Sequence, residues 1–261
     1  MPTAIAWTDE TWNPTTGCSK VSDGCDHCYA ETLSLRFGWS AKPWTPENAA
    51  ENVILHPERL RKPLTWRKPR MVFVNSMSDL FHEQIPDEFI TQVWDVMVEA
   101  KRHTFQVLTK RPERAVTFLR TYWHGGDPSV CVSPTRPAAN VWLGTSIETA
   151  QFAWRASVLK QAPAAVHFVS AEPLLGPLFN GGRPHWHLDL RGISWLIVGG
   201  ESGNGHRSVD PEWVRDLRDV AVANGTAFFF KQWGGRTPEA GGRMLDGREW
   251  NELPDRSLTP A

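Results

Sequence analysis

Six short apolar runs recur along the chain from residue 70 onward, and a polar segment follows each of them. They lie within residues 70–81, 104–112, 140–148, 166–176, 194–203 and 226–235. Because these runs are apolar at consecutive positions, they indicate strands that are buried on both faces. The recurring pattern therefore predicts a parallel sheet that other elements cover.

Helical patterns lie between most of these runs. Residues 86–102 repeat apolar side chains at helical spacing, and so predict one amphipathic helix. Residues 210–225 begin with Asp-Pro, which suits a helix start, and end with a glycine, which suits a helix stop. Residues 112–123 and 148–161 predict two more helices. Strands that alternate with helices indicate an α/β fold with right-handed crossovers.

No G-x-G-x-x-G motif follows the first of these strands, so a dinucleotide-binding sheet agrees less well with the sequence than a barrel. We therefore expect a partial (β/α)6-type TIM barrel with a parallel sheet and outer helices. The 261 residues are enough for one such domain, 1–261, in which a C-terminal extension, about 236–261, wraps the surface. The Pro- and Gly-rich segments 124–140 and 180–192 indicate insertions between repeats.

Three of the four cysteines, Cys18, Cys25 and Cys28, are spaced C-x6-C-x2-C near the start of the chain. A domain of this size does not need disulfides for stability, so the spacing favours a metal or catalysis. A zinc ion would need a fourth ligand, such as His27 or His82. A [4Fe–4S] cluster held by three cysteines would leave one iron open to another ligand. Buried cysteines without a ligand are the third alternative.

Polar side chains end nearly all of the predicted strands. Each of them alone is most simply explained by contact with water. Because parallel strands end at one edge of a barrel, where active sites lie, the whole set favours a shared site. The set contains Asn75, Ser76, Ser78, Asp79, Thr109, Lys110, Arg111, Thr145, Ser146, Glu148, Ser170, Glu172, Glu201, Ser202, Lys231, Gln232 and Trp233.

The overall charge and the N-terminus restrict the partners and the compartment. The formal net charge is −1, which gives no general attraction to nucleic acid or to an anionic membrane. Residues 1–10 lack the basic and apolar regions of a signal peptide, and no window is apolar enough for a membrane span. We expect a cytoplasmic protein without a membrane segment.

Three segments carry a resemblance to a known family. WTDETWNPTTGCSKVSDGCDHCYAE at 7–31, GGESG at 199–203 and FFFKQWGG at 228–235 resemble a phage-associated family of unknown function, the DUF5131 type, described by its three-cysteine motif. The cysteine segment also resembles that of the radical S-adenosylmethionine (SAM) superfamily, which includes photoproduct lyases. The superfamily usually has C-x3-C-x2-C, so the first gap here is three residues longer, and His27 replaces the aromatic residue before the third cysteine.

This resemblance implies a set of cofactors. Cys18, Cys25 and Cys28 would bind three irons of a [4Fe–4S] cluster, and SAM would chelate the fourth iron. Reductive cleavage of SAM would give a 5′-deoxyadenosyl radical that takes a hydrogen atom from the substrate. The implied partner is a reductant such as flavodoxin or ferredoxin, and a further partner protein is an open alternative.

The resemblance also assigns residues to SAM, with one departure. The superfamily's G-G-E motif normally ends the second strand and holds the methionine amino group, but that strand here ends in VNSMSD. Asn75, Ser76 and Ser78 would hold the amino group instead, and Ser146 and Glu148 would contact the ribose. The literal GGE at 199–201 lies on a late strand, where we interpret Glu201 as facing the substrate or a cation such as Lys231.

Basic and aromatic residues suggest the substrate class. We expect modification or repair of a nucleic-acid base, because cations suit phosphates and tryptophans stack on bases. A peptide or a small metabolite is the alternative substrate. The predicted catalytic or substrate-facing residues are Lys110, Arg111, Glu172, Glu201, Lys231, Gln232 and Trp233, with Arg114 and Arg236 as further cations.

Two other interpretations stay open. Cys131 or Tyr29 would be able to donate a hydrogen atom to a substrate radical, although a free cysteine without a role is the simpler interpretation of Cys131. The second alternative is a protein without enzymatic activity, which binds or senses a partner and is stabilised by zinc or by an iron–sulfur cluster.

Overall fold

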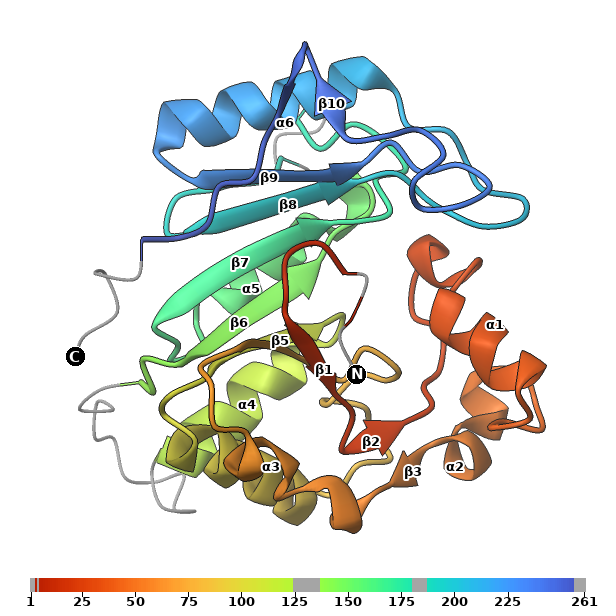
Figure 1. Ribbon diagram of the computed structural model, residues 1–261, viewed down its shortest axis with the longest axis vertical. Helices are drawn as coiled ribbons and strands as arrows, with labels where there is room; N and C mark the ends of the chain where they lie inside the picture. The colour runs from red at the N-terminus through yellow and green to blue at the C-terminus, as the bar shows by residue number, and fades with distance from the viewer. Residues whose placement is uncertain (1–2, 4, 124–136, 180–186, 256–261) are drawn as a thin grey trace.

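The computed structural model describes residues 3, 5–123, 137–179 and 187–255. Its centre is a seven-stranded sheet whose neighbouring strands are all parallel (Figure 1). Because the spatial order of the strands follows the chain and never reverses, the sheet winds in one direction, as in a half barrel. The predicted α/β class and parallel sheet are confirmed. The strands are β1 (Glu10–Trp12), β4 (Met71–Val74), β5 (Thr104–Thr109), β6 (Val141–Ser146), β7 (Val166–Ala171), β8 (Trp195–Gly199) and β9 (Ala227–Gln232).

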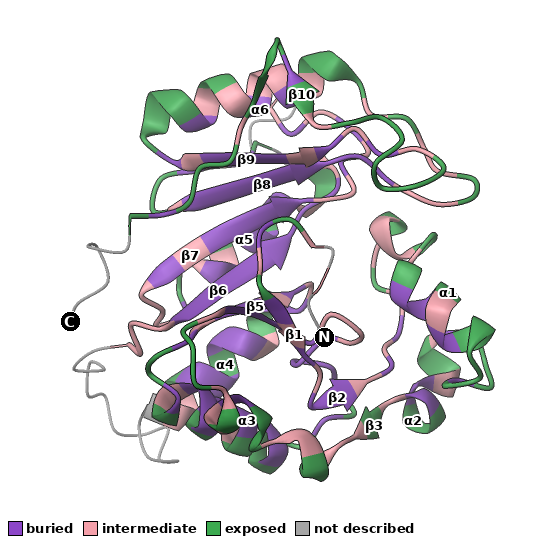
Figure 2. Ribbon diagram, in the orientation of Figure 1, coloured by how far each residue is buried: buried purple, intermediate pink, exposed green. Residues whose placement is uncertain are grey.

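Each of the six apolar runs contains one strand of this sheet, and β1 comes from the segment before the cysteines. Every residue of β4, β6 and β8 is buried (Figure 2). This burial on both faces is the reason why these runs are apolar at consecutive positions rather than at alternate ones.

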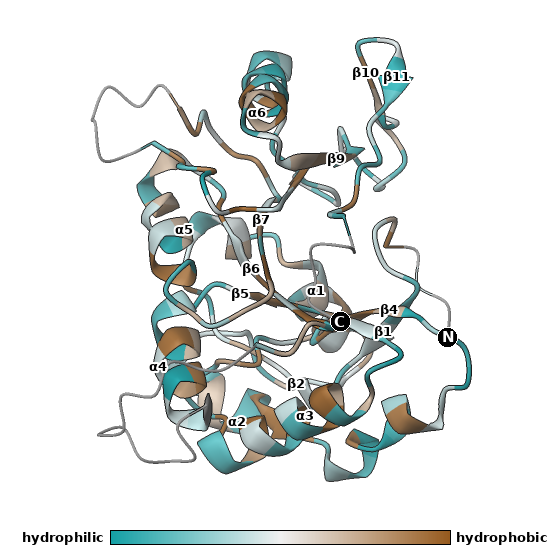
Figure 3. Cartoon of the chain, turned by 90° about the vertical axis from the view of Figure 1, so that its left-hand side faces the viewer, coloured by the Kyte–Doolittle hydropathy of each residue, from teal (hydrophilic) through white to brown (hydrophobic). Residues whose placement is uncertain are grey.

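Four helices cover the outer face of the sheet: α3 (Asp87–Glu99), α4 (Pro112–Trp123), α5 (Trp154–Leu159) and α6 (Pro211–Asn224). Figure 3 shows α4 and α5 on the same side of the sheet. A 3-10 turn, η5 (Ala150–Phe152), precedes α5, so the predicted helix at 148–161 is shorter than expected.

The ends of α6 follow the sequence prediction. The Asp210 carboxylate accepts a hydrogen bond from the Glu212 backbone N–H at 2.9 Å, which caps the first turn. Gly225 ends the helix with a φ of 67°, a left-handed conformation that favours glycine.

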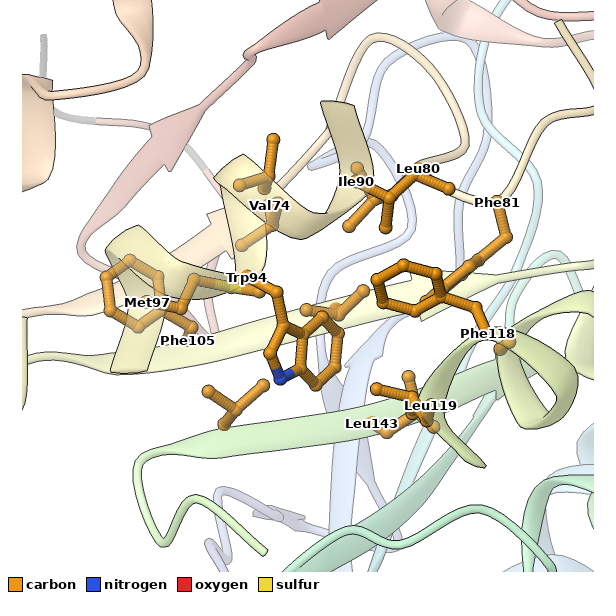
Figure 4. Packing of buried hydrophobic residues seen from close by; sticks show 14 of the residues in the cluster. Val74, Leu80, Phe81, Ile90, Trp94, Met97, Phe105, Phe118, Leu119 and Leu143 are labelled. Atoms are coloured by element: carbon orange, nitrogen blue, oxygen red, sulfur yellow. The ribbon is translucent and has the colours of Figure 1, made fainter. Parts of the chain in front are cut away.

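Two apolar clusters join the helices to the outer face of the sheet. One lies between α3, α4 and strands β4 to β6, with Trp94 packed against Phe81 and Phe118 (Figure 4). The other lies between α5, α6 and strands β7 to β9. Trp94 therefore serves the core rather than a binding surface.

A third cluster fills the inner face of the half barrel and includes Trp142, Phe168 and Trp195. Gly144 lies against one of these rings, because a Cβ atom at this position would come within 2.3 Å of the Phe168 ring. Side chains two residues apart share a face of a strand, so Ser146 follows Trp142 and Gly144 towards the carboxyl end of β6. The inner face thus changes from aromatic to small and polar residues along the strands.

Short elements connect β1 to β4 and carry the cysteine segment. The two-residue strands β2 (Thr15–Thr16) and β3 (Ile54–Leu55) pair with each other antiparallel. The other elements of this region are η1 (Asp23–Cys25), α1 (Tyr29–Arg36), η2 (Pro46–Asn48), α2 (Ala49–Asn52), η3 (Pro57–Arg59) and η4 (Lys62–Thr65).

The C-terminal segment lies along β9. After the hairpin of β10 (Met244–Leu245) and β11 (Arg248–Glu249), the Phe230 N–H donates to the Trp250 carbonyl at 2.9 Å, and the Glu252 N–H donates to the Phe228 carbonyl at 3.1 Å. These bonds cover an edge strand that would otherwise expose its backbone.

The two predicted insertions lie partly outside the described residues, and Cys131 lies there as well. In the part of the chain that the structure describes, no helix is both long and apolar enough to cross a bilayer.

Candidate functional site

The carboxyl ends of the parallel strands border a cavity of about 630 Å³. The cysteine segment, the carboxyl ends of β4 to β9 with several of the loops that follow them, residues 5–7 and the loop at 238–243 contribute to its wall. This volume is within the range of sites that hold small molecules and cofactors.

Most of the residues that the sequence analysis selected line this one cavity. They are Cys18, Cys25, Cys28, Tyr29, Asn75, Ser76, Ser78, Asp79, Thr109, Lys110, Arg111, Ser146, Ser170, Glu172, Glu201, Ser202, Lys231 and Gln232. Glu148 and Trp233 do not belong to the lining, and Cys131 is outside the described residues.

The three cysteines come from different local structures. Cys18 follows β2, Cys25 ends η1, and Cys28 immediately precedes α1. Among the described residues, no three His, Cys, Asp or Glu side chains converge closely enough to hold a single metal ion. Thiols are soft donors, which zinc ions and iron–sulfur clusters both take as ligands.

The two histidines proposed as a fourth zinc ligand have other partners. Both ring nitrogens of His82 are engaged, at 2.8 Å with the Ser19 hydroxyl and at 3.1 Å with the Gln84 N–H. The Nδ1 atom of His27 lies 3.0 Å from the Glu201 carboxylate.

Cations face the cysteines. The Arg111 guanidinium lies 3.6 Å from the Cys18 sulfur. Burial raises the pKa of Cys18 to about 12 even though Arg111 acts to lower it. Burial also raises the pKa of Cys28, against the backbone amides of Glu31 and Ala30 in the first turn of α1. Without a metal these two thiols are protonated at neutral pH, so metal binding would release protons.

Glu148 joins the cysteine segment to the half barrel. It is fully buried, and its carboxylate binds the Lys110 ammonium, the Arg155 guanidinium at 3.0 Å and the Ser22 hydroxyl at 2.9 Å. The Gly24 backbone lies against it, because a Cβ atom there would come within 2.3 Å of the Glu148 side chain.

The loop after β4 turns at Asn75, which has a φ of 60°. The Asn75 amide donates to the Thr15 hydroxyl at 2.9 Å, but its buried Oδ1 has no hydrogen-bond partner in the described part of the chain. Ser78 shares a hydrogen bond of 2.7 Å with Thr15, and Ser76 bonds the Asn13 side chain at 3.2 Å. Tyr29 donates from its hydroxyl to the Ser76 carbonyl.

Glu172 and Lys231, which both line the cavity, form an ion pair. The two residues come from the strands on either side of β8 and meet near Gly199, where a Cβ atom would lie 3.3 Å from the Glu172 carboxyl carbon. The Gln232 amide donates to the Ser202 hydroxyl at 2.9 Å.

Trp233 lies away from the cavity. Its indole N–H donates to the Met244 carbonyl at 2.9 Å, and its ring packs edge-on against Phe230. This side chain holds the C-terminal segment against the sheet.

Over nearly its whole length, residues 2–254, the sequence matches a family that is described as a protein of unknown function, DUF5131. The chain belongs to the DUF5131 family. No curated protein and no solved structure matches it. The family resemblance is thus confirmed. The DUF5131 description names no reaction, and nothing in these matches supports the further resemblance to the radical SAM superfamily.

Sequence reasoning missed three polar residues of this DUF5131 site. Ser22 and Arg155 bind Glu148, and Arg207 binds both Glu201 and the cysteine segment. Arg155 is a charged residue within a predicted helix, which by itself is typical of a solvated face. Only its burial in the tertiary structure distinguishes it.

Proposed function

We propose that this DUF5131 protein is a radical SAM enzyme on a partial (β/α)6-type TIM barrel, to which β1 adds a seventh strand. Cys18, Cys25 and Cys28 would hold a [4Fe–4S] cluster. One observation supports the proposal most directly: the three cysteine thiols line one cavity at the carboxyl ends of a parallel sheet whose strand order follows the chain. That end of a β/α barrel is where its active sites lie.

The chain's own groups suit a cluster held by thiolates and the amino-acid part of SAM, which is zwitterionic. When bound, the two cofactors supply the electron transfer and hydrogen-atom abstraction that protein side chains do not perform. Arg111 and Lys110 lie beside the thiols and would offset part of the thiolate charge, although each of them also has a carboxylate partner. The unpartnered Oδ1 of Asn75 provides an acceptor near the cavity for the amino group of SAM. The Glu148 carboxylate is already bonded to Lys110, Arg155 and Ser22. Of the two predicted ribose contacts, Ser146 and Glu148, we therefore prefer Ser146, which lines the cavity.

The substrate that we propose is a nucleic-acid base, in a modification or repair reaction. The cations in the wall are matched by carboxylates: Lys110 by Glu148, Arg111 by Asp79, and Lys231 by Glu172. This pairing disfavours a phosphate inside the cavity, and suits a neutral base that has left its stack while the backbone stays outside. A cytoplasmic reductant of the flavodoxin or ferredoxin class completes the proposal.

The decisive experiment is anaerobic reconstitution with iron and sulfide, followed by reduction and electron paramagnetic resonance with and without SAM. We expect a [4Fe–4S]⁺ signal that changes when SAM is added, together with formation of 5′-deoxyadenosine. A cluster signal that ignores SAM would indicate an electron-transfer or sensing protein. Stoichiometric zinc without a cluster would indicate a binding protein stabilised by metal. Either result overturns the enzyme proposal.

A further inference from the structure

The cysteine segment lies over the carboxyl end of the half barrel, and polar residues from three strand ends hold it there. After β5, Arg111 donates to the Ser19 carbonyl at 3.2 Å and to its hydroxyl at 3.0 Å. After β6, Glu148 accepts from Ser22. After β8, Arg207 donates to the Asp23 carbonyl at 2.8 Å. The long gap between the first two cysteines is therefore attached to the barrel at successive points.

The third attachment is built around Glu201, which is almost fully buried. Its carboxylate accepts from the Arg207 side chain at 2.6 Å on one oxygen and at 3.0 Å on the other, and from the Arg207 backbone N–H at 2.8 Å. The His27 ring lies 3.0 Å from the second oxygen. Two-point bonding of this kind fixes the guanidinium in one orientation.

Arg207 uses its remaining donors on the cysteine segment. Besides the Asp23 carbonyl, it contacts the Asp26 carboxylate at 3.3 Å. Asp23, Asp26 and His27 surround Cys25 and immediately precede Cys28. Every contact made by Glu201 and Arg207 with this segment thus falls between its second and third cysteines or just before them.

The loop that carries Glu201 is itself held firmly. The Gly200 N–H donates to the Gln232 carbonyl at 2.9 Å, and the Gly235 N–H donates to the Glu201 carbonyl at 3.0 Å. A Cβ atom on Gly200 would lie 2.0 Å from the Trp233 carbonyl oxygen, and one on Gly234 would lie 2.1 Å from the Glu201 carbonyl oxygen. The glycines of the GGESG and QWGG motifs therefore allow the loops after β8 and β9 to touch.

We propose that Glu201 and Arg207 are positioning residues that set the placement of Cys25 and Cys28, whereas Arg111 places Cys18. The late GGE motif then serves the cysteine segment and not the substrate, because both oxygens of Glu201 are already bonded. The inference rests on the proposed function in taking these thiols as cluster ligands, but the placement itself exists before any cluster binds.

The test is the alkylation rate of each thiol in metal-free, reduced protein. Trypsin cleaves after Lys20 and Arg36, so Cys18 falls on one peptide and Cys25 and Cys28 on the next. In Arg207→Gln and Glu201→Gln we expect Cys25 and Cys28 to react about 10- to 100-fold faster, the range expected when a charge-assisted hydrogen bond is lost. Cys18 should react at its original rate.

Matched variants and outcomes make the test selective. Arg215→Gln removes a half-buried, ion-paired arginine of α6 and should change none of the three rates. Glu201→Asp, which keeps the charge, should restore part of the protection that Glu201→Gln loses. Equal acceleration of all three thiols would mean general destabilisation, and no acceleration would mean that the contacts do not hold the segment. Either result overturns the inference.

The outcome separates this inference from the proposed function. Selective acceleration in a protein that never forms a SAM-responsive cluster would support the positioning role and reject the enzyme. If the protein forms a SAM-responsive cluster but Arg207→Gln leaves the alkylation rates of Cys25 and Cys28 unchanged, the enzyme proposal is supported and the positioning role is rejected.

Discussion

Replacing Glu148 with glutamine should destabilise the protein more than any other single loss of charge around the cavity. Its carboxylate has no exposure to solvent and neutralises both Lys110 and Arg155, of which Arg155 is itself only 2% exposed. Removing one partner of a buried ion pair costs about 3–5 kcal/mol, because the other charge stays buried and unpaired. Glutamine keeps the shape and still accepts from Ser22, so we expect about 3 kcal/mol, the lower end of this range.

Urea unfolding and thermal melting followed by circular dichroism measure this change. For a domain of this size, about 3 kcal/mol corresponds to a fall of about 6–12 °C in Tm. Although burial acts to raise it, Lys110 and Arg155 lower the pKa of Glu148 below its ordinary value of 4.5. The stability that Glu148 contributes is therefore present above pH 4.5 and is lost as the pH falls, so the two proteins should converge in acid.

The matched control is Glu172→Gln, which removes a carboxylate of the cavity wall that is ion-paired with Lys231 and is 19% exposed. We expect it to cost about 1 kcal/mol, as for a partly solvated ion pair. If Glu148→Gln cost no more than Glu172→Gln, or if its effect were the same at pH 7 and in acid, the buried charges would not depend on Glu148 and the reasoning would be wrong.

Three further predictions concern the cluster, the inner face and the pH dependence. Under the proposed function, Cys25→Ala should abolish the visible absorption of the reconstituted protein and 5′-deoxyadenosine formation, because one iron of the cluster would lose its ligand. Gly144→Ala should cost about 1–3 kcal/mol in urea unfolding, since the new methyl group would overlap the Phe168 ring. Burial lowers the pKa of His82 to about 4 from 6.5, so the unfolded chain binds a proton between these pH values and the folded protein does not. Stability should therefore fall as the pH drops from 6.5 to 4, by up to about 1.4 kcal/mol per pH unit, and His82→Gln should remove this slope.

The first two of these predictions have a control variant, and all three have a contrary result. Cys131→Ala, which removes the one other cysteine, should leave absorption and cleavage intact, and an equal loss in both variants would count against the three-cysteine site. Gly176→Ala places its methyl group at 3.6 Å or more from any neighbour and should be neutral, so equal costs at both glycines would contradict the packing argument. An unchanged pH slope in His82→Gln would show that other groups produce it.

The strands and helices were predictable because they depend on local patterns. Apolar runs marked six of the seven strands, and the Asp-Pro start and glycine stop of α6 determine its ends at short range. The predicted helix at 148–161 was too long, because the segment begins with the turn η5 and with Glu148, whose side chain serves the site rather than a helix face.

The sequence by itself determined that the chain is an α/β protein whose polar strand ends meet at one edge, since parallel strands leave no other arrangement for such residues. It also placed the three cysteines in one short segment. Only the tertiary structure decided which of these polar groups are bonded to other side chains and which remain available to bind a ligand. Ion pairing is a long-range property: Glu201 is bonded to His27 from 174 positions away, and Glu148 to Ser22 from 126. No local pattern specifies such partners, and for this reason two glutamates that the sequence analysis assigned to the ribose and to the substrate prove to be bonded to the cysteine segment.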